Sequence, residues 1–247
     1  MTALESHGLK KTYPGAADPA LRGLDLAIQE GEFFGLLGPN GAGKTTAISI
    51  FTGLRAASEG SVRVFGADLA KAGADVRRRI GLVPQDIALF PTLTVRENLL
   101  YFGRLYGLGG ADLDRRIADT LDRVALSDAA DRIVDTLSGG MKRRANLAAG
   151  LVHGPTLLFL DEPTVGVDAQ SRATIVATLE VLARTGVTMV YTTHYLEEAQ
   201  RLCGRVAIID HGRVLAEGAP SDLIARTEGC GSLEDVFLHL TGRELRD

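Results

Sequence analysis

The stretch EFFGLLGPNGAGKTT occupies residues 32–46 and decides how this chain folds. Its first part, Glu32–Leu37, is apolar after the initial glutamate, which is typical of a fully buried strand, and it leads directly into a glycine-rich turn. Two glycines five positions apart, followed by a lysine and a hydroxyl residue, form the pattern of a phosphate-binding loop. We expect the loop to consist of Gly38, Pro39, Asn40, Gly41, Ala42, Gly43, Lys44, Thr45 and Thr46.

The residue types in this loop suit a nucleotide triphosphate. Glycines let backbone N–H groups close around phosphate oxygens, and the helix that follows presents the positive end of its dipole. The Lys44 ammonium can neutralise charge on the β- and γ-phosphates, and the Thr45 hydroxyl can ligate magnesium. The loop therefore predicts a site for a nucleotide and Mg²⁺.

A second apolar run, Leu157–Leu160, is followed by two carboxylates, Asp161 and Glu162. Ligands of open α/β sheets bind at the carboxyl ends of the strands. Asp161 can hold the magnesium shell, and Glu162 can accept a proton from an attacking water. Together with the phosphate loop, this pair predicts hydrolysis of the nucleotide.

A third signal is the sequence LSGGMKRR, in which Ser138, Gly139 and Gly140 open a helix. A hydroxyl, bare backbone amides and a helix dipole form a second anion site. A chain with two phosphate-binding helix starts is expected to contact one nucleotide from both sides. One of the two contacts then comes from another subunit.

The remaining pattern predicts an α/β fold with a parallel sheet, because apolar strands alternate with helices. Leu24–Ile28 alternates in polarity, which is typical of an antiparallel strand. The other expected strands are Ser61–Phe65, Ile80–Val83, Thr156–Leu160, Val187–Tyr191 and Val206–Ile209. We expect residues 1–85 and 136–247 to form the core of one domain, with residues 86–135 as an inserted helical subdomain.

Three helices carry recognisable signals. Thr94 and Glu97 form a capping box that opens a helix running to Tyr106, and Ser232 is placed to cap a short helix near the end of the sequence. In the third helix, every third or fourth residue is apolar and forms a stripe, namely Leu113, Ile117, Leu121 and Val124.

Composition excludes several classes of protein. Hydrophobic residues make up 45% and charged residues 23%, which is ordinary for a globular protein. With 27 basic and 31 acidic residues the net charge is −4, so no nucleic-acid partner is expected. The two cysteines, Cys203 and Cys230, fit no metal or redox spacing. No apolar run reaches the ~20 residues that span a bilayer, so any membrane role is expected to act through a partner.

The three motifs together resemble the ATP-binding cassette (ABC) ATPases. They occur in that family's order: the phosphate loop Gly38–Thr46, the signature Ser138–Gly140, and the strand end Asp161–Glu162. The resemblance covers essentially the whole chain. It implies a P-loop NTPase core with an added antiparallel β subdomain and a helical subdomain, and it implies ATP and Mg²⁺ as ligands.

The resemblance implies roles for four more residues. Tyr13 matches the aromatic residue that stacks on adenine. Gln85 matches the glutamine that reads the magnesium ion and the γ-phosphate and passes movement to the helical subdomain. Asp168 matches the loop that contacts the opposite subunit, and His194 matches the histidine that senses the γ-phosphate.

The signature departs from the family at one position, where Met141 replaces the usual glutamine. A thioether lacks the donor and the acceptor of an amide, so polar contacts from this position are expected to be lost. Two further stretches, Pro163–Asp168 and Leu233–Phe237, resemble cassettes of exporters whose permease is a separate subunit. That branch handles drugs, antibiotics, lipids or polysaccharides.

The predicted function is an ATPase subunit that drives a membrane exporter by ATP-dependent closure of a dimer. Its expected partners are a second cassette and an integral-membrane permease. The permease is expected to hold it on the cytoplasmic face of the cell membrane. The alternatives are the ATPase of an importer, or an ABC ATPase that works on ribosomes or DNA. A kinase or GTPase switch leaves the Ser-Gly-Gly signature unexplained.

Overall fold

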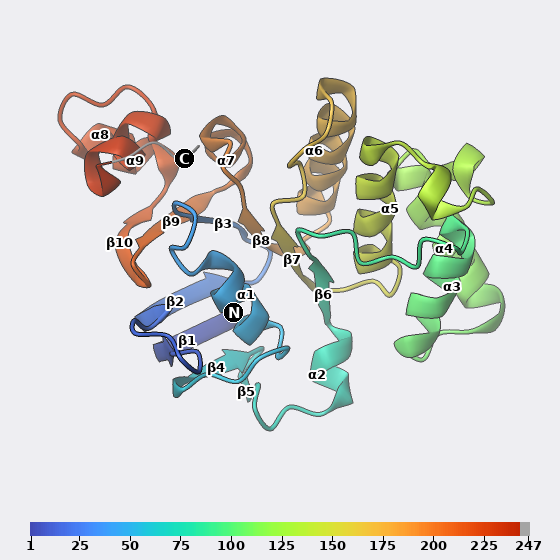
Figure 1. Cartoon of the computed structure of the whole chain (residues 1–247), viewed down its shortest axis with the longest axis horizontal. Helices are drawn as coiled ribbons and strands as arrows, with labels where there is room; N and C mark the ends of the chain where they lie inside the picture. The colour runs from blue at the N-terminus through green and yellow to red at the C-terminus, as the bar shows by residue number, and fades with distance from the viewer. Residues whose placement is uncertain (243–247) are drawn as a thin grey trace. The chain divides into compact units, whose positions relative to one another are not determined.

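The structure is a computed structural model that describes residues 1–242, and it divides into two compact units. One unit comprises residues 1–77 together with the chain from residue 188 onward, and the other comprises residues 78–187. The elements of both units are labelled in Figure 1. The predicted site residues are divided between the two units.

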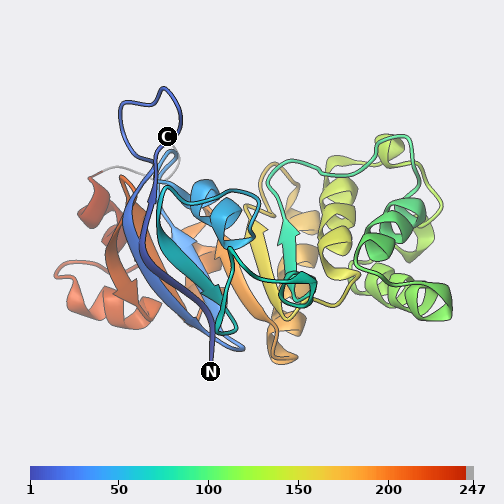
Figure 2. The ribbon, with the colours of Figure 1, turned by 90° about the horizontal axis from the view of Figure 1, so that it is seen from below.

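An antiparallel sheet in the first unit has the strand order β2-β1-β4-β5 (Figures 1 and 2). Its strands are β1 Thr2–Lys11, β2 Leu21–Gln29, β4 Glu59–Val64 and β5 Ala67–Asp68. The antiparallel strand predicted over Leu24–Ile28 is confirmed as part of β2, which pairs with β1. Leu24, Leu26 and Ile28 are buried while the residues between them are exposed, so one face of β2 packs into the core.

Four further strands of the first unit carry the segments in which the sequence predicts the phosphate loop and His194. β3 Phe33–Leu37 lies between β8 Thr188–Thr192 and β9 Arg205–Asp210 and pairs in parallel with both. β10 Arg213–Gly218 pairs antiparallel with β9. All five residues of β3 are buried, as its apolar run predicts. Because parallel strands end at the same edge, the segments after β3 and β8 emerge side by side.

The helices of the first unit are α1 Lys44–Phe51, α7 Leu196–Leu202, α8 Pro220–Arg226 and α9 Leu233–Thr241. The predicted capping of α9 is confirmed, because Ser232 Oγ accepts a hydrogen bond from the Asp235 N–H at 3.1 Å. The buried side of α9 consists of Leu233, Val236 and Phe237. A short helix, α2 Ala74–Arg78, precedes the second unit.

The second unit is built on a parallel pair of strands, β6 Ile80–Val83 and β7 Leu157–Asp161. Its helices are α3 Val95–Leu105, α4 Gly110–Arg123, α5 Gly139–Leu151 and α6 Ala169–Arg184, with 3₁₀ turns at Ser127–Ala129 and Val134–Thr136. Helix α5 approaches β6 at two glycines, since a Cβ on Gly81 would lie 2.6 Å from the carbonyl oxygen of Gly150. Only residues without a side chain allow the helix and strand to come this close.

The helical segment agrees with its predicted signals. Thr94 Oγ1 accepts from the Glu97 N–H at 3.1 Å, and the Glu97 carboxylate accepts from the Thr94 N–H at 2.8 Å, so the capping box is confirmed. The predicted stripe on and just after α4 is buried; it consists of Leu113, Ile117, Leu121 and Val124. The limits 86–135 for a helical subdomain remain a prediction.

Several predicted element ends are wrong by one or two residues, including the bounds predicted for β3, β4 and β9. The strand predicted over Thr156–Leu160 begins and ends one residue later, and the strand predicted over Val187–Tyr191 does the same. In both cases the last strand residue is polar, Asp161 or Thr192, so the apolar run stops before the strand does. Helix α3 ends at Leu105 rather than at Tyr106, which is its C-cap.

His153 is a buried packing residue of the second unit. Its ring stacks on Tyr106 with the ring centroids 3.7 Å apart. Nε2 lies 3.0 Å from the carbonyl oxygen of Ile80 and therefore carries the proton. Nδ1 is buried and has no hydrogen-bond partner within residues 1–242. Burial lowers the pKa of His153 from 6.5 to about 4, so the folded protein holds a neutral imidazole.

This burial predicts a loss of stability in mild acid. The unfolded chain binds a proton at His153 as the pH falls below 6.5, whereas the folded chain resists until about pH 4. The free energy of unfolding should therefore fall by about 2–3 kcal/mol from this residue between pH 7.5 and pH 4.5. Urea denaturation of the parent and of His153→Phe, which keeps the stacked ring, measures the difference. An equal pH dependence in both proteins would contradict the assignment.

Candidate functional site

The phosphate loop connects β3 to α1 in a conformation that depends on glycine. Gly41 and Gly43 have φ of +80° and +105°, which side chains rarely allow. A Cβ on Gly43 would also lie 2.6 Å from the carbonyl oxygen of Ala20. Gly38 is closely packed as well, because its Cβ would lie 2.4 Å from the carbonyl oxygen of Ile209. The loop is therefore held from two sides by neighbouring backbone.

Lys44, the first residue of α1, folds back over this loop. Its Nζ donates to the carbonyl oxygens of Gly38 at 2.7 Å and Pro39 at 3.2 Å. The side chain is buried, with 7% of the residue exposed. A phosphate seated in the loop meets this ammonium and the N–H groups at the start of α1 together, which is the arrangement that anion binding requires.

Tyr13 lies beside the loop and is half-buried. Its hydroxyl is 3.1 Å from Thr46 Oγ1, the last hydroxyl of the loop. The Lys11 ammonium and the Arg55 guanidinium each lie 5.5 Å from the centre of the Tyr13 ring. The structure thus brings Tyr13 to the loop, and it adds two cations that the sequence motifs did not indicate.

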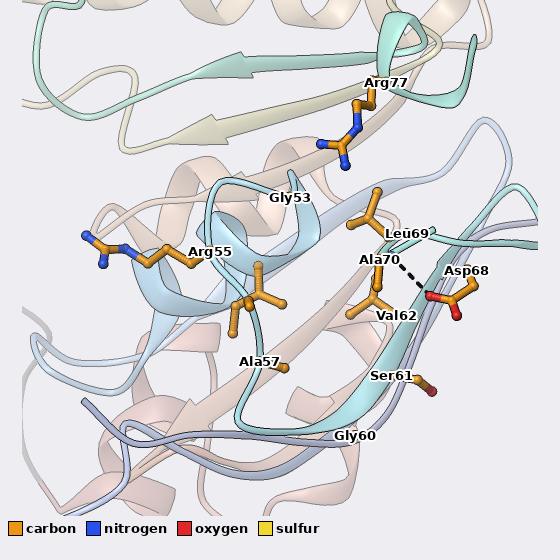
Figure 3. A pocket seen from close by; sticks show the side chains of 12 residues that line it. Gly53, Arg55, Ala57, Gly60, Ser61, Val62, Asp68, Leu69, Ala70 and Arg77 are labelled. Carbon is orange, nitrogen blue, oxygen red and sulfur yellow. Dashed lines mark hydrogen bonds between the residues drawn. The ribbon is translucent and has the colours of Figure 1, made fainter. Parts of the chain in front are cut away.

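A cavity of about 410 Å³ lies next to this region, between the end of α1 and strands β4 and β5. Figure 3 shows Arg77 directed toward Gly53, and Arg55 directed away from Val62 and Leu69. None of the predicted site residues lines this cavity. Arg55 lines the cavity, while its guanidinium also lies beside the Tyr13 ring.

His194 follows β8 and is half-buried. Strands β3 and β8 pair in parallel, with Phe33 opposite Met189 and Gly35 opposite Tyr191. The phosphate loop and His194 consequently leave the sheet at the same edge. The two motifs of the first unit therefore lie at one edge of the sheet.

In the second unit, Gln85 and the two carboxylates also share a strand edge. The last pair of β6 and β7 is Val83 opposite Leu160, so Gln85 and Glu162 each follow two residues later. Asp161 and Glu162 are buried, at 3% and 8% exposed. Glu162 has a φ of +49°, an uncommon conformation for a residue with a side chain. This turn directs the chain out of the sheet immediately after the carboxylates.

Arg143, on α5, is a neighbour of this edge that sequence reasoning missed. Its guanidinium donates to the carbonyl oxygen of Gln85. Burial lowers the pKa of Arg143, and the negative charges of Asp86 and Glu162 act in the opposite direction. The only sequence signal was a basic residue one turn after the signature glycines. It does not by itself indicate a neighbour 58 residues away.

The signature residues begin α5, as predicted. Ser138 is the N-cap, and its Oγ accepts from the Met141 N–H at 3.3 Å. Gly139 is exposed and has open space around its Cα, whereas a Cβ on Gly140 would lie 1.9 Å from Ser171 Oγ. Gly139 is therefore accessible to a ligand, while Gly140 allows α5 to pack against α6.

Asp168 is the N-cap of α6 and lies beside the signature. Its carboxylate accepts from the Ser171 N–H at 2.9 Å, and backbone hydrogen bonds of this kind hold its pKa below the usual value. The same carboxylate would be 3.0 Å from a Cβ on Gly140. The structure thus brings Asp168 and the Ser-Gly-Gly signature together at two neighbouring helix starts.

Within residues 1–242, no group of three or more histidine, cysteine or acidic side chains could hold a metal ion. In the same part of the chain, no helix has both the length and the apolar character needed to cross a bilayer.

Comparison with known proteins agrees with these observations. A family model described as ABC transporter matches residues 21–165. The linearmycin resistance ATP-binding protein of Bacillus subtilis (strain 168) is 44% identical over 238 residues, which cover 96% of this chain and 74% of that protein. The Nod factor export ATP-binding protein I of Paraburkholderia xenovorans (strain LB400) is 45% identical over 232 residues, or 94% of this chain and 76% of that protein. Both names agree with the predicted exporter-type ATP-binding subunit.

Among solved structures, a dimeric ATP-binding cassette in a post-hydrolysis state, bound to ADP and Pi, matches with a TM-score of 0.80. It is 29% identical, and the match covers 87% of this chain and 98% of that one. The predicted P-loop fold and the predicted ATP hydrolase activity are thereby confirmed. The chain belongs to the ABC transporter family, as one of its ATP-binding and ATP-hydrolysing cassettes.

Proposed function

We propose that this chain is the subunit that powers an exporter, bound to a separate membrane permease on the cytoplasmic face of the cell membrane. The observation that carries the proposal is the phosphate loop, with the buried Lys44 ammonium folded over it. Two matched relatives are named for linearmycin resistance and for Nod factor export, and these names support outward transport. The transported compound is then bound by the permease, while this chain supplies energy from ATP.

In this proposal the phosphate loop binds the triphosphate of ATP, and Tyr13 stacks on the adenine ring. The oxygen donors of Thr45, Gln85 and Asp161 are of the hard type that Mg²⁺ prefers. These three residues would hold the ion, which neutralises charge on the phosphates when it is bound. Lys44 replaces its hydrogen bonds to two loop carbonyls with hydrogen bonds to phosphate oxygens. The exchange costs little free energy, because the ammonium has hydrogen-bond acceptors in both cases.

Hydrolysis then uses groups at the strand ends. Glu162 accepts a proton from the water that attacks the γ-phosphate, and the bond to the β-phosphate oxygen breaks. Lys44 and His194 stabilise the charge that develops on the transferred phosphoryl group. Glu162 is 8% exposed, so little solvent competes for the water that its carboxylate orients.

The signature acts on the nucleotide of a second subunit in this proposal. Ser138 and Gly139 are exposed at the start of α5, where a hydroxyl, free amides and the helix dipole favour an anion. Asp168 lies beside them and contacts the opposite subunit. The γ-phosphate therefore stabilises the closed dimer, and its removal lets the dimer reopen.

We place the permease contact at apolar residues on α3 and in the segment that precedes it. Phe90, Tyr101 and Leu105 are 42%, 43% and 64% exposed, respectively. Phe90 and Tyr101 pack edge to face with their ring centroids 4.8 Å apart. An exposed group of this kind suits an apolar partner surface. Movement of Gln85 would reach the permease through this segment.

Glu162→Gln should keep ATP binding but abolish turnover, because an amide of the same shape cannot accept the proton. We expect kcat to fall by about 10²–10³-fold. The unhydrolysed nucleotide should hold the dimer together, which size-exclusion chromatography with ATP measures. Glu234→Gln, at an exposed position on α9, serves as the control and should behave as the parent. Parental turnover by Glu162→Gln would overturn the role of Glu162.

Mixed dimers test whether each site is shared between subunits. Lys44→Ala damages the phosphate loop, and Gly140→Ala damages the signature, where its Cβ would collide with Ser171 Oγ at 1.9 Å. In one mixed dimer, one chain carries Lys44→Ala and the other carries Gly140→Ala. This dimer keeps one intact shared site and should retain about half of the parental ATPase activity. A dimer of a doubly mutated chain with a parental chain should be inactive. The reverse result would show that each chain works alone.

Leu105→Glu tests the permease surface. We expect this variant to leave the membrane fraction of cells that express the permease, because a carboxylate in an apolar interface is costly. The ATPase activity of the purified variant should stay unchanged. Leu54→Glu is the matched control, since Leu54 is 67% exposed and lies outside this surface. Membrane retention of Leu105→Glu to the same extent as Leu54→Glu would contradict the proposed contact.

A further inference from the structure

The segment that carries His194 is tied on both sides to one carboxylate, Glu198. On the side of β8, the Tyr191 hydroxyl donates to Glu198 Oε2. The Thr193 hydroxyl donates to the same oxygen at 3.4 Å and accepts from the Tyr195 N–H at 2.9 Å. We call Tyr191, Thr193 and Glu198 the carboxylate clip. It closes the short loop between β8 and α7 around His194.

The clip is mounted on rigid elements. Tyr191 is fully buried, and the edge of its ring packs against Phe33 of β3 with the centroids 5.8 Å apart. Helix α7, which carries Glu198, is itself anchored, because Gln200 Oε1 accepts from the N–H of Leu233 at the start of α9. Both ends of the clip are therefore fixed by the fold and not by the loop that they hold.

The chemistry of the clip suits a positioning role. Hydrogen bonds from hydroxyl groups to an ionised carboxylate are shorter and stronger than those between neutral groups. Tyr191 is buried in β8, which pairs with β3, the strand that carries the phosphate loop. The clip therefore fixes the position of His194 relative to that strand. A catalytic group displaced by about 1 Å can lose about 10²-fold in rate. A fixed backbone at His194 thus matters directly for the proposed contact with the γ-phosphate.

We propose that Tyr191 and Glu198 are positioning residues for ATP hydrolysis, which act by holding His194 toward the γ-phosphate. This inference rests on the proposed role of His194. Neither residue touches the nucleotide in the proposal, so ATP binding should not depend on them. Their effect should appear in kcat and should vanish when His194 is absent.

Steady-state hydrolysis of MgATP by the purified full chain tests the clip. Tyr191→Phe removes one hydroxyl and should lower kcat about tenfold, with KM for ATP changed less than about twofold. Glu198→Leu should do the same, whereas Glu198→Gln keeps an acceptor oxygen and should recover most of the activity. Glu197→Leu, at the exposed neighbouring position on α7, is the matched control and should have the parental kcat. Should Glu198→Leu fail to fold, Tyr191→Phe carries the test.

A second set of variants separates positioning from general stability. His194→Ala and the double variant Tyr191→Phe/His194→Ala should hydrolyse ATP at the same residual rate, followed by release of radiolabelled phosphate. The clip would be overturned if Tyr191→Phe lowered the hydrolysis rate by the same factor with and without His194. It would also be overturned if Tyr191→Phe had the parental kcat while His194→Ala was deficient. A parental kcat for His194→Ala would instead overturn the role of His194 itself, and with it the clip.

Discussion

Parallel pairing of strands is the constraint on which the rest of this molecule depends. A parallel strand delivers its carboxyl end to the same edge as its neighbour, whatever the sequence between them. In the first unit, β3 and β8 place the phosphate loop and His194 at one edge. In the second, β6 and β7 do so for Gln85 and the pair Asp161–Glu162. The predicted site residues of each unit are therefore neighbours because of the register in which the parallel strands pair.

Helix starts supply the second half of the arrangement. Helices α1, α5 and α6 all begin at a predicted motif, and no preceding helical turn bonds their first N–H groups. In α5 and α6 the N-cap side chains, Ser138 and Asp168, each accept a hydrogen bond from the third helical residue. Glycine makes these helix starts possible in two ways. At Gly43 it permits a left-handed backbone, and at Gly140 it permits close contact between two helices. The same residue type therefore serves conformation in one motif and packing in another.

Much of this could be predicted from sequence, and the particular residues show why. The phosphate loop, the Thr94 capping box and the start of α5 at Ser138 are local patterns, in which adjacent residues contain the whole signal. Strand ends were less accurate, since Asp161 and Thr192 continue their strands after the apolar run has stopped. Hydrophobic periodicity reports burial, and it has no information on where backbone pairing ends.

By itself, the sequence determined the family and the positions of its sequence motifs, because each motif depends on residue types at short spacing. Tertiary structure alone decided which distant side chains support those motifs. Arg143 donates a hydrogen bond to the carbonyl oxygen of Gln85, which is 58 positions away in the sequence. Glu198 accepts a hydrogen bond from the hydroxyl of Tyr191, which lies on a strand. Such contacts depend on the direction in which packed elements point their side chains, and no local pattern encodes that direction.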